Sequence, residues 1–114
     1  MTNWHVEIEA QRYGARVWRN NSGACTADDG RLISYGLGNT SKDINKRIKS
    51  SDYIGWDRNG YFLAIEQKPA GWKYRPSDEH ATAQLRFLFL VQLGGGTGTW
   101  ATCPADIERA LGKK

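Results

Sequence analysis

The stretch that decides the fold is SDYIGWDRNGYFLAIEQK, residues 51–68. Its two apolar segments, residues 52–56 and 61–67, are joined by a short link that contains Asn59-Gly60, a dipeptide typical of the tight turn of a β-hairpin. The sequence therefore predicts two antiparallel strands that pair with each other. Residues 62–65 are continuously apolar, which indicates an internal strand buried on both faces of its sheet.

Charged side chains stand where these two strands leave the core. Side chains alternate along a strand, so Glu66 and Lys68 share one face while Gln67 points away from it. If the strands pair, Asp52 reaches the same face. Two carboxylates and one ammonium are the minimum set for holding a divalent metal ion beside a phosphodiester. The alternative is an ordinary solvated strand end, since this spacing also arises by chance.

The length of the chain predicts a single domain, residues 1–114. The sequence contains neither a run of about 18 apolar residues nor a signal-peptide pattern, so we expect no membrane insertion and a cytoplasmic location. Cys25 and Cys103 show no CxxC spacing and no histidine cluster nearby. They are predicted to be reduced, partly buried thiols rather than a disulfide or a zinc site.

The formal net charge is +4, and the basic residues are concentrated in two blocks that adjoin the charged strand ends. The blocks consist of Lys42, Lys46, Arg47 and Lys49 before the hairpin, and of Lys68, Lys73 and Arg75 at its end and beyond. Beside a carboxylate site, such blocks are typical of contacts to a phosphate backbone. By themselves they would indicate only a solubilising surface.

Further strands are predicted outside the hairpin, at residues 15–19, 31–35 and 97–102. Residues 20–30 are rich in Asn, Ser, Gly and Asp and predict a loop. Residues 40–49 fit either a short basic helix or an ordered loop. The order of these strands and of the predicted helices along the chain predicts an α/β domain around one mixed sheet.

Three helices are predicted, at residues 4–13, 77–93 and 105–111. Gly14 would end the first, Ser77 would cap the second, and Pro104 would offer the first position of the third. The second half of the long helix is apolar nearly all round, which predicts that it is buried.

Several stretches of the chain have, in this order and at these spacings, the pattern of a known family. They are VWRNNSG at 17–23, the segment from Gly30-Arg31 to Tyr35-Gly36, KSSDYIG at 49–55, IEQK at 65–68, Gln84 before an apolar run, and Gly94-Gly95 before the last strand. Over residues 16–111, nearly the whole chain, the sequence resembles the VRR-NUC domain of the PD-(D/E)XK nuclease superfamily, particularly its small stand-alone phage versions. The resemblance implies a restriction-endonuclease-like fold, an α/β domain whose mixed central sheet is flanked by helices.

The resemblance also implies catalytic roles for the polar residues of the hairpin. Asp52 resembles the aspartate of the first half-motif, although Ser51 stands where the superfamily name has Pro. Glu66 and Lys68 resemble the Glu and Lys of the second half. Gln84 resembles the helix glutamine that faces the catalytic strand, and the alternative for it is a half-buried amide that caps backbone groups.

The implied cofactor is Mg²⁺, for which Mn²⁺ would substitute. Its ligands would be the carboxylates of Asp52 and Glu66 and the main-chain carbonyl of Gln67. Family members also carry an acidic residue on the first helix that completes the site. Here that helix is short, and Glu7 and Glu9 both lie closer to its end than the family pattern predicts. Either residue, or neither, could be that ligand.

The implied activity is metal-dependent endonuclease cleavage of DNA, with a Holliday junction or flap as the substrate and a homodimer as the acting form. Arg19 and Asn21, after the first predicted strand, and the two basic blocks would contact DNA, although Asn21 also suits a turn. Trp72 could stack on an unpaired base or lie at the rim of the core. His80 is predicted to be a surface residue.

Two other activities remain open at this point. One is a nonspecific or site-specific duplex nuclease on the same fold, because no motif records the shape of the substrate. The other is a noncatalytic DNA-binding module that has kept the fold and lost the metal.

Overall fold

The predicted hairpin forms the centre of the molecule. In the computed structural model, which describes residues 4–39 and 42–112 apart from the side chain of Lys42, β4 (Tyr53–Trp56) and β5 (Phe62–Gln67) pair antiparallel. Three consecutive residues of β5, from Leu63 to Ile65, are fully buried. Burial on both faces of this strand is therefore confirmed.

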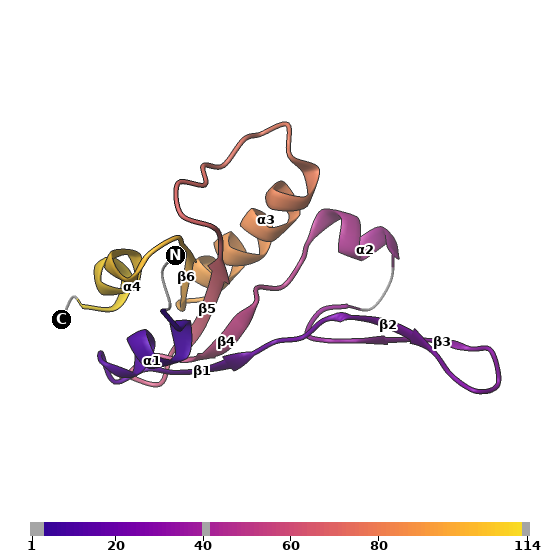
Figure 1. The fold of residues 1–114 in the computed structure, drawn as a ribbon, viewed down its shortest axis with the longest axis horizontal. Coiled ribbons are helices and arrows are strands. Elements are labelled where there is room, and N and C mark those ends of the chain that lie inside the picture. Colours follow the sequence, from indigo (N-terminus) through magenta and orange to yellow (C-terminus); the bar gives the residue numbers. More distant parts are fainter. Residues whose placement is uncertain (1–3, 40–41, 113–114) are drawn as a thin grey trace.

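Two further strands extend the hairpin into a four-stranded sheet. β1 (Arg16–Arg19) pairs antiparallel with β4, and β6 (Thr97–Ala101) pairs parallel with β5, which gives the order β1-β4-β5-β6. A parallel pair needs a long connection between its strands. Here α3 (Glu79–Leu93) supplies it, as Figure 1 shows.

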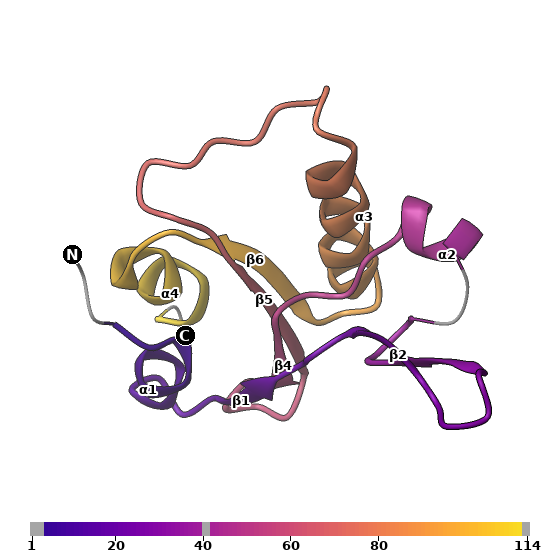
Figure 2. The same ribbon diagram turned by 45° about the vertical axis from the view of Figure 1, so that its right-hand side comes forward.

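Helices lie on both faces of this sheet. Figure 2 shows α1 (Val6–Gln11) and α4 (Pro104–Leu111) on one side and α3 on the other. The main core lies under α1 and α4, where the fully buried side chains include Val6, Leu63, Ile65 and Ile107. The domain is thus mixed α/β, with a mixed central sheet flanked by helices as predicted.

The helix boundaries differ from the prediction at two places. α1 ends two residues early, because the chain turns before Gly14, which adopts a positive φ of 79°. α3 is capped by Asp78 rather than Ser77, since the carboxylate of Asp78 accepts the N–H of Ala81 at 3.0 Å. The predicted cap at Ser77 is therefore wrong by one residue. Pro104 does occupy the first turn of α4, as predicted.

The predicted burial of the second half of α3 is wrong. Leu88 packs directly on the sheet, because Gly98 of β6 has no side chain: a Cβ there would lie 2.4 Å from the carbonyl oxygen of Leu88. The opposite side of the helix has no covering layer among the described residues. Phe89 and Leu93 are 59% and 68% exposed there. When a helix is apolar on all sides, its sequence does not predict which sides pack against other elements.

Part of the predicted loop at residues 20–30 is a strand. β2 (Gly23–Thr26) pairs antiparallel with β3 (Leu32–Tyr35) in a separate two-stranded sheet, so the described strands form two sheets rather than one. This sheet projects from the body as an arm (Figure 1). The turn chemistry is confined to the tip, where Gly30 has a φ of 87° and its N–H donates to Ala27.

Residues 42–47 form the short helix α2 (Lys42–Arg47), which settles the choice between helix and loop for that part of the segment. α2 packs against α3. Both cysteines are free, but Cys25 is exposed on the arm, so its predicted partial burial is wrong. No helix of the described chain has the length and apolarity needed to cross a membrane.

Candidate active site

The hairpin register brings Asp52 beside Glu66, as the alternation along the strands predicted. Tyr53 lies opposite Ile65 in an antiparallel pair. Asp52, just before Tyr53, is therefore a neighbour of Glu66, just after Ile65. The main-chain N–H of Asp52 donates to Glu66 Oε1 at 3.1 Å, and the N–H of Gln67 donates to Asp52 Oδ2 at 3.3 Å. Each carboxylate is therefore held by a backbone amide of the other strand.

Glu66 holds its proton more tightly than an ordinary glutamate. Its side chain ends inside the core with only 3% of the residue exposed. Burial raises its pKa to about 8, and the hydrogen bond and negative charge of the Asp52 side chain act in the same direction. The ammonium of Lys68 opposes these effects. A group of this kind needs a positive partner before it can ionise near pH 7.

Lys68 lies on the same face as Glu66 and reaches across to α3. Its Nζ is 4.0 Å from Glu66 Oε2 and donates to Gln84 Oε1 at 2.7 Å. Gln84 is itself 94% buried, and it faces β5 as the resemblance implied. The side-chain oxygen of Gln84 is therefore bonded to a lysine rather than to a backbone group.

Two tryptophans complete the surroundings of the Lys68 ammonium. The ring centroids of Trp72 and Trp100 are 5.1 and 5.5 Å from Nζ, and 4.7 Å from each other. At such distances the ring faces attract a cation. Tyr74 stacks near Trp100, and its hydroxyl is 2.8 Å from Oγ1 of Thr82 on α3. The loop after β5 is thereby tied to the helix that holds Gln84.

Neither acidic residue of α1 joins the two carboxylates. Glu7 is exposed, and Glu9 forms an ion pair with Arg12 at 3.4 Å. The helix that carries them packs on α4 and β1, at the other end of the sheet. Within residues 4–39 and 42–112, no three His, Cys, Asp or Glu residues cluster closely enough to bind a metal. The protein side chains available to an ion at this site are therefore those of Asp52 and Glu66.

The first basic block lies against the N-terminal half of α3. The N–H of Lys49 donates to the carbonyl of Ala83 at 3.0 Å, and Arg86 donates to the carbonyl of Arg47 at 3.1 Å. Lys46 is exposed on α2, while the side chain of Lys42 lies outside the described part. Partial burial lowers the pKa of the exposed His80, and the charges of Lys49 and Lys68 lower it further. This block therefore borders the site.

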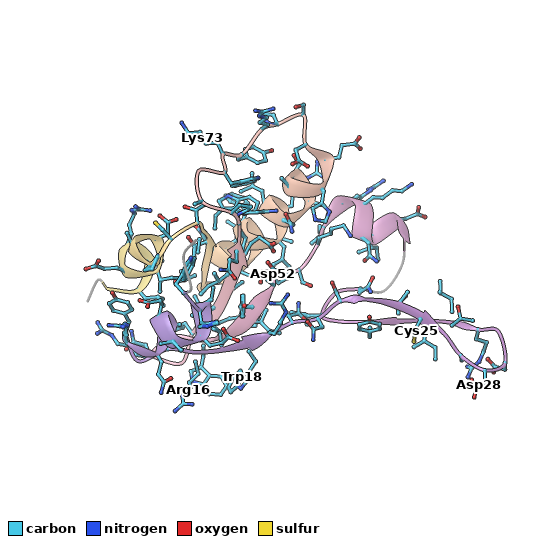
Figure 3. The ribbon with its side chains drawn as sticks, in the orientation of Figure 1. Arg16, Trp18, Cys25, Asp28, Asp52 and Lys73 are labelled. Atoms are coloured by element: carbon cyan, nitrogen blue, oxygen red, sulfur yellow. The ribbon has the colours of Figure 1, made fainter. Side chains whose placement is uncertain are left out.

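The second basic block lies on the loop that leaves β5. Lys73 and Arg75 are exposed and line a cavity of about 390 Å³ together with Trp72 and Asp78. Figure 3 shows Lys73 on the outer side of that loop, well away from Asp52. Trp72 lines this cavity and also contacts the Lys68 ammonium, whereas Lys73 itself lies away from Asp52.

Arg19 and Asn21 lie on the opposite side of Asp52. The guanidinium of Arg19 donates to Asn21 Oδ1 at 3.1 Å and to the hydroxyl of Tyr53 at 3.2 Å. A second cavity, of about 420 Å³, is lined by Arg19, Asn20, Asn21, Ser22, Tyr35 and Asp52. The site is therefore flanked by one cavity on the side of the arm and another on the side of the loop.

Three further residues lie near the site, and the sequence did not predict that position for them. Trp100 lies beside Glu66 across the β5–β6 pair, but a parallel register cannot be read from sequence. Tyr35 reaches the site only because the arm leaves the body next to Asp52. His80, correctly predicted to be at the surface, is near Lys68 because α3 starts there.

Compared with models of protein families, with curated proteins and with solved structures, the chain gives no match. A functional assignment therefore depends on the chemistry of the site itself.

Proposed function

We propose that this protein is a Mg²⁺-dependent DNA endonuclease with a restriction-endonuclease-like (PD-(D/E)XK) fold. The observation that carries the proposal is the chain of contacts from Asp52 through Glu66 and Lys68 to Gln84. It combines two carboxylates, one ammonium and a buried amide where the two central strands of the sheet end. This combination suits the hydrolysis of a phosphodiester, in which negative charge builds up on the phosphorus oxygens.

The residues present fit a hard divalent cation. Asp52 and Glu66 offer only oxygen ligands, which Mg²⁺ and Mn²⁺ prefer and which favour them over a softer metal. The raised pKa of Glu66, about 8, reflects a buried carboxyl group whose charge the Lys68 ammonium, 4.0 Å away, does not fully balance. A bound cation would supply that balance and displace the proton. The carbonyl of Gln67, next to Asp52 in the hairpin, is the proposed third protein ligand.

Lys68 and Gln84 would each have a distinct role beside the metal ion. When bound, the metal ion supplies Lewis-acid activation of the phosphodiester and of the attacking water. Lys68 neutralises charge that develops in the transition state. Gln84 keeps the Lys68 ammonium pointed at Glu66 by accepting its hydrogen bond at 2.7 Å. A charge held in place beforehand needs little reorganisation during the reaction.

DNA binding would be electrostatic and shared between the flanks of the site. Lys46 and Arg47 lie on α2, Lys49 follows that helix, and Lys73 and Arg75 lie on the loop beyond Trp72. We propose branched DNA, such as a junction or flap, as the substrate. Cleavage of two strands would then require a symmetric homodimer, since one domain offers one site.

The test is a cleavage assay with a four-way junction and a linear duplex of the same sequence, with and without Mg²⁺ or Mn²⁺. We expect metal-dependent cleavage by the wild type, faster on the junction, and none by Glu66→Ala. Equal rates on the two substrates would favour the duplex-nuclease alternative. Cleavage by Glu66→Ala at the wild-type rate would refute the proposed site.

One observation favours a second candidate, a noncatalytic DNA-binding module. Within the described part of the chain, no third acidic residue joins Asp52 and Glu66. If the wild type and Glu66→Ala bind the junction with equal affinity and neither cuts it in Mg²⁺ or Mn²⁺, the DNA-binding module is correct and the endonuclease proposal is wrong.

A further inference from the structure

The cavity between the arm and the sheet is a separate feature from the carboxylate pair. It measures about 420 Å³, which lies within the range of small-ligand sites. Its walls come from the end of β1, from the link into the arm, from the end of β3 and from Asp52. Figure 3 shows Asp52 near the middle of the molecule, and Cys25 and Asp28 farther out along the arm. The cavity thus lies at the base of the arm.

The floor of this cavity is fixed by Asn20. Its side-chain amide donates to Ser50 Oγ at 2.8 Å and to the carbonyl of Ser51 at 2.9 Å, and it accepts the N–H of Leu37 at 3.1 Å. Its main-chain N–H donates to the carbonyl of Asp52. One asparagine therefore joins the start of β4, the link into the arm and the chain that leaves it. A ligand would meet a preformed surface.

Arg19 gives the cavity a positive group that still has hydrogen-bond donors to offer. Its Nε is bonded to Asn21, and its Nη1 is bonded to Tyr53. Its Nη2 has no partner among the described residues. A guanidinium that is held by two neutral partners and still has free N–H groups is well suited to a phosphate oxygen.

Tyr35 gives the cavity an aromatic surface. The residue is 47% exposed, and its ring lies across Gly23: a Cβ at Gly23 would be 2.8 Å from the Tyr35 hydroxyl. The side-chain amide of Asn39 donates to the carbonyls of both Gly23 and Tyr35 at 2.7 Å. The backbone under the ring is therefore fixed, while part of the ring remains open to solvent.

We propose that this cavity binds one unpaired nucleotide of the DNA strand, next to the phosphate that is cut. Arg19 contacts a phosphate, and the base stacks on Tyr35. The proposal rests on the proposed function for the role of Asp52, which forms the wall nearest the scissile phosphate. With this site, the preferred substrate is DNA that has an unpaired nucleotide at the cleavage point, rather than a continuous duplex.

The occupant must be unpaired because of the way Tyr35 is presented. In a duplex both faces of every base are already covered by neighbouring bases, so an aromatic ring can stack only on a base that has left the helix. The volume of about 420 Å³ is large enough for one nucleotide. Flaps and bulges offer such a nucleotide.

Two measurements test this site. The first compares kcat/KM in Mg²⁺ for a duplex with one bulged nucleotide and for the fully paired duplex of the same sequence. The second measures the affinity of a short fluorescein-labelled oligothymidylate in EDTA, where no cleavage can occur. Tyr35→Leu removes the ring, Tyr35→Phe keeps it, and Tyr61→Leu is the matched control, because Tyr61 is 59% exposed in the hairpin turn at the other end of the sheet.

We expect Tyr35→Leu to lower both the bulge-to-duplex ratio and the oligothymidylate affinity by roughly tenfold, as removal of one base–aromatic stack does. Tyr35→Phe and Tyr61→Leu should behave as the wild type. If Tyr35→Leu retains the wild-type ratio and affinity, the nucleotide site is refuted. If the wild type cuts no DNA at all, the proposed function fails, and the affinity measurement alone then decides whether the nucleotide site exists.

Discussion

Replacing Glu66 by Gln tests the electrostatics of the site without any substrate. Glutamine has nearly the same shape, and its Oε1 can still accept the N–H of Asp52, which lies 3.1 Å from the Glu66 oxygen. Its amide can donate to the Asp52 carboxylate. The variant therefore keeps the packing and removes only the titration of the carboxyl group.

The sign of the effect follows from the raised pKa. In the folded protein the pKa of Glu66 is about 8, against an ordinary value of 4.5. Between these values the folded state keeps a proton that the unfolded state has released, so stability falls as pH rises. This contribution is fully present below about pH 4.5 and is lost as pH rises through about 8.

The size of the effect is set by the difference between the two pKa values. One pKa unit corresponds to about 1.4 kcal/mol, so the upper limit is about 5 kcal/mol. Asp52 is only half-buried and lets water approach the pair, which reduces this figure. We expect the wild type to lose roughly 2–4 kcal/mol of unfolding free energy between about pH 5 and pH 9 because of Glu66.

The assay is urea unfolding in EDTA at several pH values, followed by tryptophan fluorescence. Glu66→Gln should show a much flatter dependence on pH than the wild type. Glu108→Gln is the matched control, because Glu108 is exposed on α4, and it should follow the wild type. The same slope in the wild type and Glu66→Gln would mean that Glu66 is ionised in the folded protein, and the reasoning about the buried acid would be wrong.

Three further outcomes are expected. Lys68→Ala should lower the cleavage rate by about 10²–10³ while DNA affinity changes little, because its charge acts mainly in the transition state; single-turnover kinetics and a binding titration check this. Reversing Lys46 and Lys49 to Glu should reduce the slope of log affinity against log salt by about one for each DNA phosphate that the protein no longer neutralises. Gly98→Val should lower stability by more than about 2 kcal/mol in urea unfolding, since a Cβ would lie 2.4 Å from the Leu88 carbonyl oxygen.

The hairpin and its charged ends could be predicted because they depend on local signals. The Asn59-Gly60 turn fixes which residues pair, and alternation then fixes the face that each side chain occupies. Asp52, Glu66 and Lys68 therefore came together as the sequence indicated. The contact between Lys68 and Gln84 joins elements far apart in the chain, and only the family resemblance pointed to it.

The errors concern features that depend on the surroundings of an element. The sequence of β2, Gly-Ala-Cys-Thr, contains no bulky apolar side chain, and it forms a strand because β3 pairs alongside it. Phe89 and Leu93 are as apolar as buried residues but lie on the side of α3 that no described element covers. Tertiary contacts, which propensity does not encode, decide both cases.

The two sides of the site are built differently, and this bears on how a substrate would enter. On the loop side, Trp72 and Tyr74 are tied to Lys68 and Thr82, so this side is already closed around the ammonium. On the arm side, a two-stranded sheet is exposed along its length and has little stability of its own. Its base is nevertheless fixed, because Asn39 joins both strands there. On the proposed function, Tyr35 would hold its position while the rest of the arm adjusts to the DNA strand, so the arm side is the proposed entrance.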